Sequence, residues 1–118
     1  MNEHEKINYV ELPSRDLSKT KTFFDKAFGW SFQDYGAEYT AFFNQGINGG
    51  FYQADLASDS KNGAALIVFY SKDLASTLDK VKDAGGIITK DIFAFPGGRR
   101  FHFTEPCGNE FAVWSDKN

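Results

Sequence analysis

The stretch SRDL at residues 14–17 decides the fold, because it returns as SKDL at residues 71–74. Each copy ends an alternating apolar segment and opens a stretch whose apolar side chains have helical spacing, which places Asp16 as a helix N-cap. Gly29 and Gly86, which we expect to end the two helices, are separated by the same offset as the two copies. A single offset that holds at both ends of a helix predicts an internal repeat.

Strand and turn signals divide both repeats in the same way. In the first repeat we expect a strand, a helix and three strands at residues 7–14, 16–29, 30–35, 38–44 and 50–54. In the second repeat we expect the same order at residues 64–71, 73–85, 86–92, 99–105 and 109–115. The order βαβββ therefore occurs twice.

The fold predicted from this repeat belongs to the α+β class. Two βαβββ modules, at about residues 7–54 and 64–115, are joined by a polar, flexible linker at residues 55–63. Because one module alone is too small to bury its sheet face, we expect the modules to pair into one curved, cup-like, eight-stranded mixed sheet with the helices on the outside. Residues 1–118 are then a single domain.

Composition and charge exclude several classes of function. The single cysteine, Cys107, rules out an intramolecular disulfide, and a reducing cytoplasm is the expected location. Neither a leader-like start nor a run of about 18 apolar residues is present, so neither secretion nor membrane spanning is expected. The formal net charge is -3 and no basic stripe is present, so nucleic acid is not an expected partner.

Aromatic residues are unusually abundant, with 13 Phe, 5 Tyr and 2 Trp, which is more than a core of this size needs. Aromatic side chains favour strands and also line pockets for small molecules. The excess therefore favours a β-rich domain with a concave apolar surface that takes a small-molecule ligand.

The turn EPCGNE at residues 105–110 leads into the apolar strand FAVWS, and it follows two paired modules of the same order. Together they resemble the vicinal oxygen chelate superfamily, which includes glyoxalase I, bleomycin-resistance proteins, fosfomycin-resistance enzymes and extradiol dioxygenases. The resemblance covers about residues 7–115 and implies a ligand-binding cup between two modules. Because this fold serves many chemistries, the resemblance is more specific for fold than for activity.

The resemblance also implies where a metal ion would bind in metal-using members, with one ligand from the first and one from the last strand of each module. These positions are occupied here by Tyr9, approximately Tyr52, Leu66 and Ala112. Leu66 and Ala112 have no ligand atom, and a phenol is an uncommon ligand for a divalent ion. The chain therefore looks most like the metal-free, glyoxalase-related branch, with no metal and no other cofactor.

Alternation along the strands assigns further side chains to the cup. If Ala112 faces the cup, Glu110 and Trp114 share that face. The same argument from Tyr9 and Leu66 adds Ile7, Glu11, Val68 and Tyr70.

The strand before the turn has the same two-sided pattern. Phe101 and Phe103 are the natural core pair, which leaves Arg100, His102 and Thr104 on the opposite face, the wall of the cup. Arg100 is suited to orient an anionic group and His102 to transfer a proton near neutral pH. A pairing of Arg100 with a carboxylate is the alternative.

Three functions remain open from the sequence. The first is a small-molecule-binding protein that sequesters a partly aromatic or anionic ligand in a metal-free cup. Arg100 or His102 would orient the ligand, and the stacking rings would be Tyr9, Tyr52, Tyr70 and Trp114.

The second function is a metal-independent lyase or isomerase that transfers a proton through His102 or Glu110. The third is a non-catalytic module that binds another protein. In each case we expect a homodimer, because the linker allows the modules to close a cup within one chain or to exchange with a second chain.

Overall fold

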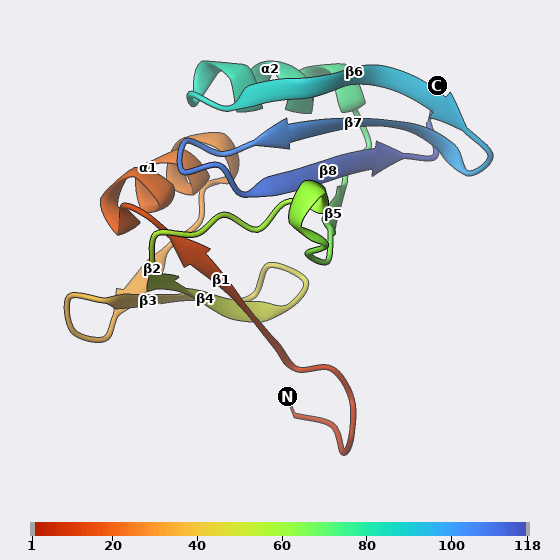
Figure 1. Ribbon diagram of the computed structural model, residues 1–118. Helices are drawn as coiled ribbons and strands as arrows, with labels where there is room; N and C mark the ends of the chain where they lie inside the picture. Colours follow the sequence, from red (N-terminus) through yellow and green to blue (C-terminus); the bar gives the residue numbers. More distant parts are fainter. Residues whose placement is uncertain (1, 118) are drawn as a thin grey trace.

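The repeat in the sequence is a repeat in the structure. The computed structural model describes residues 2–117. The first module contains β1 (Tyr9–Ser14), α1 (Leu17–Phe28), β2 (Phe32–Asp34), β3 (Tyr39–Phe42) and β4 (Asn48–Gln53), and Figure 1 shows their arrangement. The second contains β5 (Ile67–Tyr70), α2 (Leu74–Asp83), β6 (Ile87–Phe95), β7 (Gly98–Thr104) and β8 (Glu110–Ser115). The α+β class and the predicted order βαβββ in both modules are confirmed.

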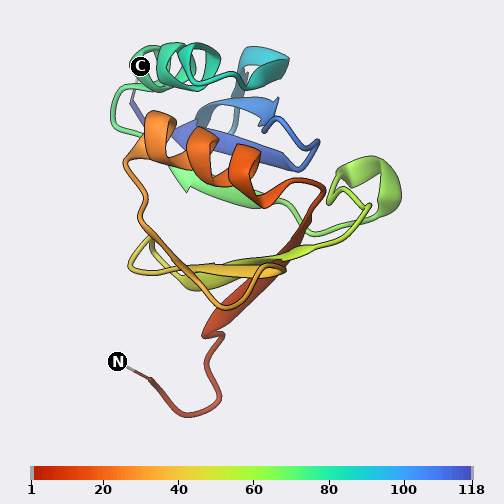
Figure 2. The same ribbon diagram turned by 90° about the vertical axis from the view of Figure 1, so that its left-hand side faces the viewer.

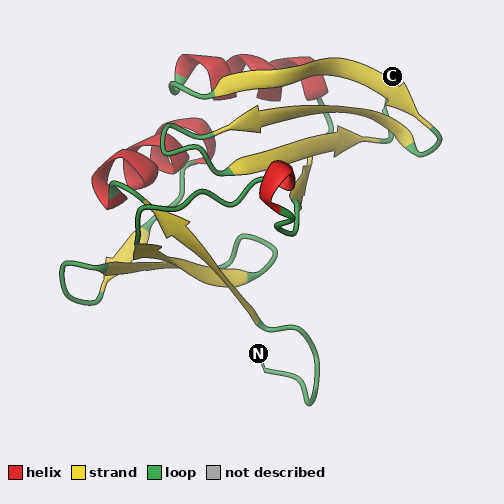
Figure 3. Cartoon of the chain, in the orientation of Figure 1, coloured by secondary structure: helices red, strands yellow, loops and turns green. Residues whose placement is uncertain are grey.

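The strands form two four-stranded mixed sheets, which Figure 3 shows in yellow. Sheet A has the strand order β1-β4-β3-β2, and sheet B has the equivalent order β5-β8-β7-β6. In each sheet the first and last strands of the module run parallel, and the remaining neighbours are antiparallel. The expected single eight-stranded sheet is thus divided in two, with no ladder between β1 and β5 among residues 2–117.

Both helices begin with the same hydrogen bond, which explains why the SRDL and SKDL segments lie at helix starts. The Asp16 carboxylate accepts from the backbone N–H of Lys19 at 3.2 Å, and Asp73 accepts from Ser76 at 3.2 Å. These N-caps satisfy amide groups that have no partner inside the helix.

The serine of each segment is also bonded in the same way. Ser14 Oγ lies 2.8 Å from Thr20 Oγ1, and Ser71 Oγ lies 2.7 Å from Thr77 Oγ1. The repeat therefore extends to individual side-chain contacts at the start of each helix.

The end of the second helix differs from the prediction by one residue. Gly29 follows α1 in the left-handed conformation, with φ of 72°, as expected for a helix stop. After α2 the left-handed residue is Gly85, with φ of 101°, and not Gly86. Gly86 is needed for close packing instead, because a Cβ there would lie 2.6 Å from the side chain of Val81. α2 is two residues shorter than α1, which shifts its stop.

One aromatic core joins the two modules. The Phe24 ring of α1 is completely buried, and its centroid lies 5.6 Å from that of Phe51 in sheet A and 5.4 Å from that of Phe111 in sheet B. Figure 2 shows α1 above sheet A and in front of the strands of sheet B, while α2 contributes Leu74 and Val81 to the same core. The helices therefore lie on the core side of both sheets, and the opposite faces, here called the open faces, are turned away from the core.

The predicted linker at residues 55–63 is held in place rather than free. It contains a short 3-10 helix, η1 (Ser60–Asn62), capped by the carboxylate of Asp59. Ser58 and Ser60 are hydrogen bonded to residues of the 105–110 turn, as described below. None of the helices within residues 2–117 has the length and apolar character needed to cross a membrane.

Candidate functional site

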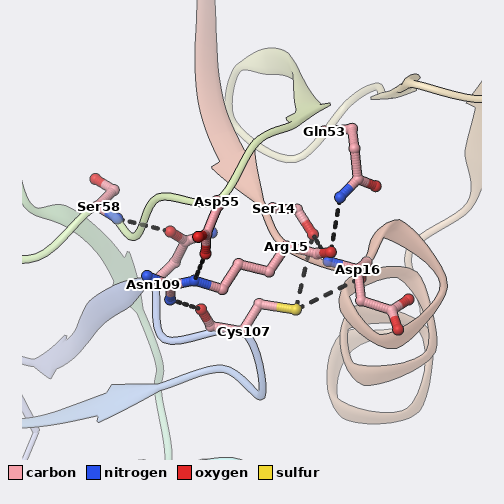
Figure 4. Close-up of polar contacts among 8 residues, drawn as sticks. All are labelled: Ser14, Arg15, Asp16, Gln53, Asp55, Ser58, Cys107 and Asn109. Carbon is pink, nitrogen blue, oxygen red and sulfur yellow. Dashed lines mark hydrogen bonds and ion pairs between the residues drawn. The ribbon is translucent and has the colours of Figure 1, made fainter.

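The 105–110 turn connects the two modules, as Figure 4 shows. The guanidinium of Arg15, at the end of β1, donates through Nη1 to the carbonyl oxygen of Cys107 at 3.0 Å. The same side chain donates through Nε to Asp55 of the linker at 2.8 Å. Arg15 therefore holds the first module, the linker and the turn together.

Asn109 completes this connection from inside the protein, where it is fully buried. Its amide nitrogen donates to the carbonyl oxygen of Pro13 at 2.7 Å, and its amide oxygen accepts from the backbone N–H of Ser58 at 2.8 Å. The buried carboxylate of Glu105 accepts from Asn109 at 2.9 Å. The turn motif is thus explained by its part in joining the modules.

A chain of polar side chains crosses the open face of sheet B. Arg100 donates through Nε to Nε2 of His102 at 3.2 Å, and Nδ1 of His102 lies 3.3 Å from Oε2 of Glu110. Because arginine only donates, Nε2 is the acceptor and the imidazole proton sits on Nδ1, where it is donated to Glu110. The other oxygen of Glu110 accepts from the backbone N–H and the hydroxyl of Ser60, both at 2.8 Å.

The charges of this chain follow from its surroundings. Burial lowers the pKa of His102, and the bond to Glu110 opposes this effect, while the charges of Arg100 and Lys90 lower the pKa further. The pKa of Glu110 is lowered chiefly by the backbone N–H of Ser60. At neutral pH the arrangement is a neutral imidazole oriented by a carboxylate and flanked by a guanidinium.

Aromatic rings border the polar chain. The Phe93 ring centroid lies 5.8 Å from that of His102, and the Arg100 guanidinium lies 5.7 Å from the Phe95 centroid. The ring centroid of Trp114 lies 5.2 Å from that of Tyr70 and 6.3 Å from that of Phe95. The face therefore presents basic side chains beside aromatic rings.

The sequence analysis did not place any residue of β6 on this face, because the strand is irregular. Lys90 pairs with His102 and Phe93 pairs with Arg100, so three steps along β6 match two steps along β7. Such a β-bulge changes which residues face each side, so that Lys90 and Phe93 share the open face. A strict period of two gives no signal for this change.

Six of the predicted site residues lie together on the open face of sheet B: Tyr70, Arg100, His102, Glu110, Ala112 and Trp114. Phe101 and Phe103 are fully buried on the opposite face, as the alternation predicted. Leu66 lies immediately before β5, and Val68 is the residue paired with Ala112.

Tyr9 and Tyr52 lie elsewhere, on the open face of sheet A. There the Tyr39 hydroxyl donates to Oε2 of Glu11 at 2.9 Å, and the Tyr9 hydroxyl lies 2.5 Å from that of Tyr39. Tyr39 reaches this position across Gly50, where any Cβ would collide with the phenol. The sequence signal that could have placed Tyr39 on this face is the glycine at position 50, which leaves room for the Tyr39 phenol.

Comparison with known families identifies the class of protein. Residues 6–113 match the family model described as Glyoxalase/Bleomycin resistance protein/Dioxygenase superfamily. The chain belongs to this superfamily, and the resemblance predicted from the repeat and the turn is confirmed at that level. A search of curated proteins found no match.

Solved structures share the fold at low sequence identity. A glyoxalase-related enzyme from Fulvimarina pelagi is 16% identical with a TM-score of 0.79, and the match covers 94% of this chain and 88% of that one. The fosfomycin resistance protein FosX from Listeria monocytogenes is 17% identical with a TM-score of 0.77, covering 94% and 93%. A glyoxalase/bleomycin resistance protein/dioxygenase family enzyme from Burkholderia phytofirmans PsJN is 14% identical with a TM-score of 0.74, covering 92% and 96%.

The residues on the open face of sheet B do not fit a divalent metal ion of the kind found in this superfamily. His102 and Glu110 are two adjacent donors, but Nε2 of His102 already accepts from the positively charged Arg100. Within residues 2–117 no three His, Cys, Asp or Glu side chains are grouped as a metal site requires. We therefore assign no chemistry to a metal here.

Proposed function

We propose that this protein binds a small, partly aromatic, anionic molecule on the open face of sheet B without a metal ion. The observation that carries the proposal is the Arg100–His102–Glu110 chain within its border of aromatic rings. Arg100 uses Nε on His102, so its terminal nitrogens remain for a carboxylate, phosphonate or similar group. Trp114 and Phe93 supply ring surfaces for the apolar part of the ligand.

A neighbour in fold gives independent support for the ligand class. A mutant of the Listeria fosfomycin resistance protein was solved in complex with Mn(II) and 1S,2S-dihydroxypropylphosphonic acid. That ligand carries a phosphonic acid, and the basic group on the open face of sheet B is suited to the same kind of anion.

We also propose that the protein is a homodimer. Tyr70 and Val68 are 51% and 43% exposed on the open face of sheet B, and Tyr9 is 40% exposed on that of sheet A. A second copy that laid one face over the other would cover these apolar surfaces. Sedimentation at tens of micromolar would then show twice the subunit mass of 13.2 kDa, and a single species at 13.2 kDa would contradict the dimer.

A second candidate function, a metal-independent isomerase or lyase, is favoured by the His102–Glu110 pair. Glu110 holds the proton on Nδ1, so Nε2 is a base once a substrate displaces Arg100 from it. Nε2 would take a proton from a carbon beside a carbonyl group, the electron pair of the broken C–H bond would pass to the carbonyl oxygen, and Arg100 would stabilise the resulting enolate. Return of the proton to the opposite face of the same carbon, or to the far carbon of a conjugated dienolate, completes an isomerisation.

Thermal denaturation with a panel of aromatic carboxylates and phosphonates tests the proposed function. A ligand at 100 times its Kd should add about 2.7 kcal/mol to the free energy of unfolding. The response should be the same with and without divalent metals, and elemental analysis should find no stoichiometric zinc, nickel, manganese or iron. A response to metal alone, or one bound transition metal per subunit, would reject the metal-free site.

A further inference from the structure

The linker between the modules is attached to the start of β8. The carbonyl oxygen of Ser58 accepts from the backbone N–H of Glu110 at 2.8 Å, and the backbone N–H of Ser58 donates to Oδ1 of Asn109 at 2.8 Å. Two residues further on, the N–H and the hydroxyl of Ser60 both donate to Oε1 of Glu110. The linker therefore holds Glu110 by its backbone and by its side chain.

The segment that carries Ser60 is itself closed by hydrogen bonds. Oδ1 of Asp59 accepts from the backbone N–H of Asn62 at 3.0 Å and so caps η1. The carbonyl oxygen of Ser60 accepts from the N–H of Gly63 at 3.1 Å, and Gly63 ends η1 in the left-handed conformation, with φ of 78°. Ser60 is therefore presented to Glu110 from a closed turn of the linker.

Glu110 needs this support to hold His102. A glutamate side chain has several rotatable bonds, so a single bond to an imidazole does not fix its carboxylate. While Oε1 of Glu110 is held by Ser60, Oε2 lies 3.3 Å from Nδ1 of His102. The backbone N–H of Ser60, more than its hydroxyl, also lowers the pKa of Glu110. At neutral pH the carboxylate is therefore ionised and directed at Nδ1.

We propose that Ser60 is a positioning residue for the ligand site on the open face of sheet B. Through Glu110 it keeps the proton of His102 on Nδ1 and leaves Nε2 as an acceptor. Arg100 then has an acceptor for its Nε–H, and its terminal nitrogens remain for the anionic group. This role rests on the proposed function, because it matters only if that face binds a ligand. It does not require Ser60 to be accessible, so a second copy over the face leaves it unchanged.

One substitution removes both donors of Ser60 and retains η1. Ser60→Pro has neither an N–H nor a hydroxyl, and Ser60 is the first residue of η1, where proline is favoured. Asp59 before it has the extended backbone that a following proline requires, with φ of -140° and ψ of 161°. The bond from Gly63 uses the carbonyl oxygen of residue 60 and is kept. The proline ring takes the place of the lost N–H, so Oε1 of Glu110 has to move away.

Long-range ¹H–¹⁵N NMR of the imidazole nitrogens, at mildly alkaline pH and without ligand, tests the proposal. The chain has two histidines, and the exposed His4 serves as an internal reference. Arg100→Ala is the background, because Arg100 itself favours the Nδ1–H tautomer through its bond to Nε2. In that background His102 should keep its proton on Nδ1. Adding Ser60→Pro should move the main population to Nε2–H, which an unsupported histidine prefers, and Ser60→Ala should give an intermediate mixture.

Two further variants separate this role from general effects on the linker. Ser60→Thr keeps both donors and should behave like the unaltered residue. Ser58→Ala is the matched control, because the hydrogen bonds of Ser58 within residues 2–117 use its backbone alone. Loss of Nδ1–H in Arg100→Ala alone, no change on adding Ser60→Pro, or an equal change with Ser58→Ala or Ser60→Thr would overturn the proposal. If Ser60→Pro does not fold, the same comparison is made with Ser60→Ala.

Binding of benzoate keeps this test distinct from the test of the proposed function. In the chain that retains Arg100, Ser60→Pro should weaken benzoate binding about threefold to tenfold, because the Nε–H of Arg100 loses its acceptor. Equal affinity of Ser60→Pro and the unaltered protein would reject the positioning role and leave the proposed function in place. If the unaltered protein binds no aromatic carboxylate or phosphonate, the proposed function fails, and the positioning role fails with it.

Discussion

The open faces of sheets A and B differ in chemistry although the two modules share one frame. At equivalent positions of the repeat, β1 presents Tyr9 and Glu11 where the β5 segment has Leu66 and Val68. Sheet A offers phenols and a carboxylate, and sheet B offers a guanidinium and an imidazole. The capping contacts and the buried strand faces are repeated in both modules. Packing of the shared core therefore constrains the backbone of each module, while the side chains of the open faces can differ.

The largest effect should come from the residue that both sheets share. Phe24→Ala should lower the free energy of unfolding by about 3–5 kcal/mol, because it removes a buried ring that contacts both modules. Urea denaturation followed by circular dichroism and tryptophan fluorescence should still give one transition, since the core is continuous. Phe43→Ala, which truncates a 42% exposed ring, is the control and should have a small effect. Separate unfolding of the two modules would contradict a shared core.

The connection through Asn109 should have the next largest effect. Asn109→Ala leaves the buried carbonyl of Pro13 and the half-buried N–H of Ser58 without their partner, and the loss of a partner for a buried group costs about 1–3 kcal/mol. We expect a decrease in unfolding free energy of about 2–4 kcal/mol by urea denaturation. The exposed Asn8→Ala is the matched control. A silent Asn109→Ala would show that the turn does not hold the modules together.

The asymmetry between the faces leads to a prediction about ligand binding. Arg100→Ala should leave the fold intact and weaken binding of an aromatic carboxylate by about 1.5–3 kcal/mol, measured by calorimetry. Arg99→Ala removes the same charge from the same strand, but Arg99 lies on the other side, beside the start of α2. It should have little effect, and equal losses in both variants would indicate general electrostatic attraction rather than a site.

The sequence predicted the features that depend on regular periodicity. The repeat of SRDL gave the two modules, and alternation placed Phe101 and Phe103 in the core and His102 on the opposite face. These predictions succeed because β7 and β8 pair without interruption, so a period of two is maintained along both strands.

The remaining features depend on departures from regularity. The bulges in β6 bring Lys90 and Phe93 to the face of His102, and the missing side chain at Gly50 admits Tyr39. The division into two sheets accompanies tertiary contacts, such as those of Phe24 in α1 with both sheets, which the local sequence pattern does not reveal. Tyr9 and Tyr52 were therefore grouped in the sequence with residues that lie on a different sheet.

The smallest effect should be the contribution that His102 of sheet B makes to the pH dependence of stability. The pKa of His102 is lowered from 6.5, mainly by burial, so the unfolded chain binds more protons than the folded chain as the pH falls through and below 6.5. The free energy of unfolding should therefore decrease between pH 7.5 and 5.5, by less than any of the ring or amide deletions. His102→Gln should flatten this decrease, because glutamine does not titrate.

Tyr39→Phe on sheet A should leave the decrease unchanged, because the raised pKa of Tyr39 keeps the phenol neutral throughout that range. Urea midpoints at the two pH values measure both variants. A decrease that persists in His102→Gln and disappears in Tyr39→Phe would place the titrating group on sheet A and contradict the prediction.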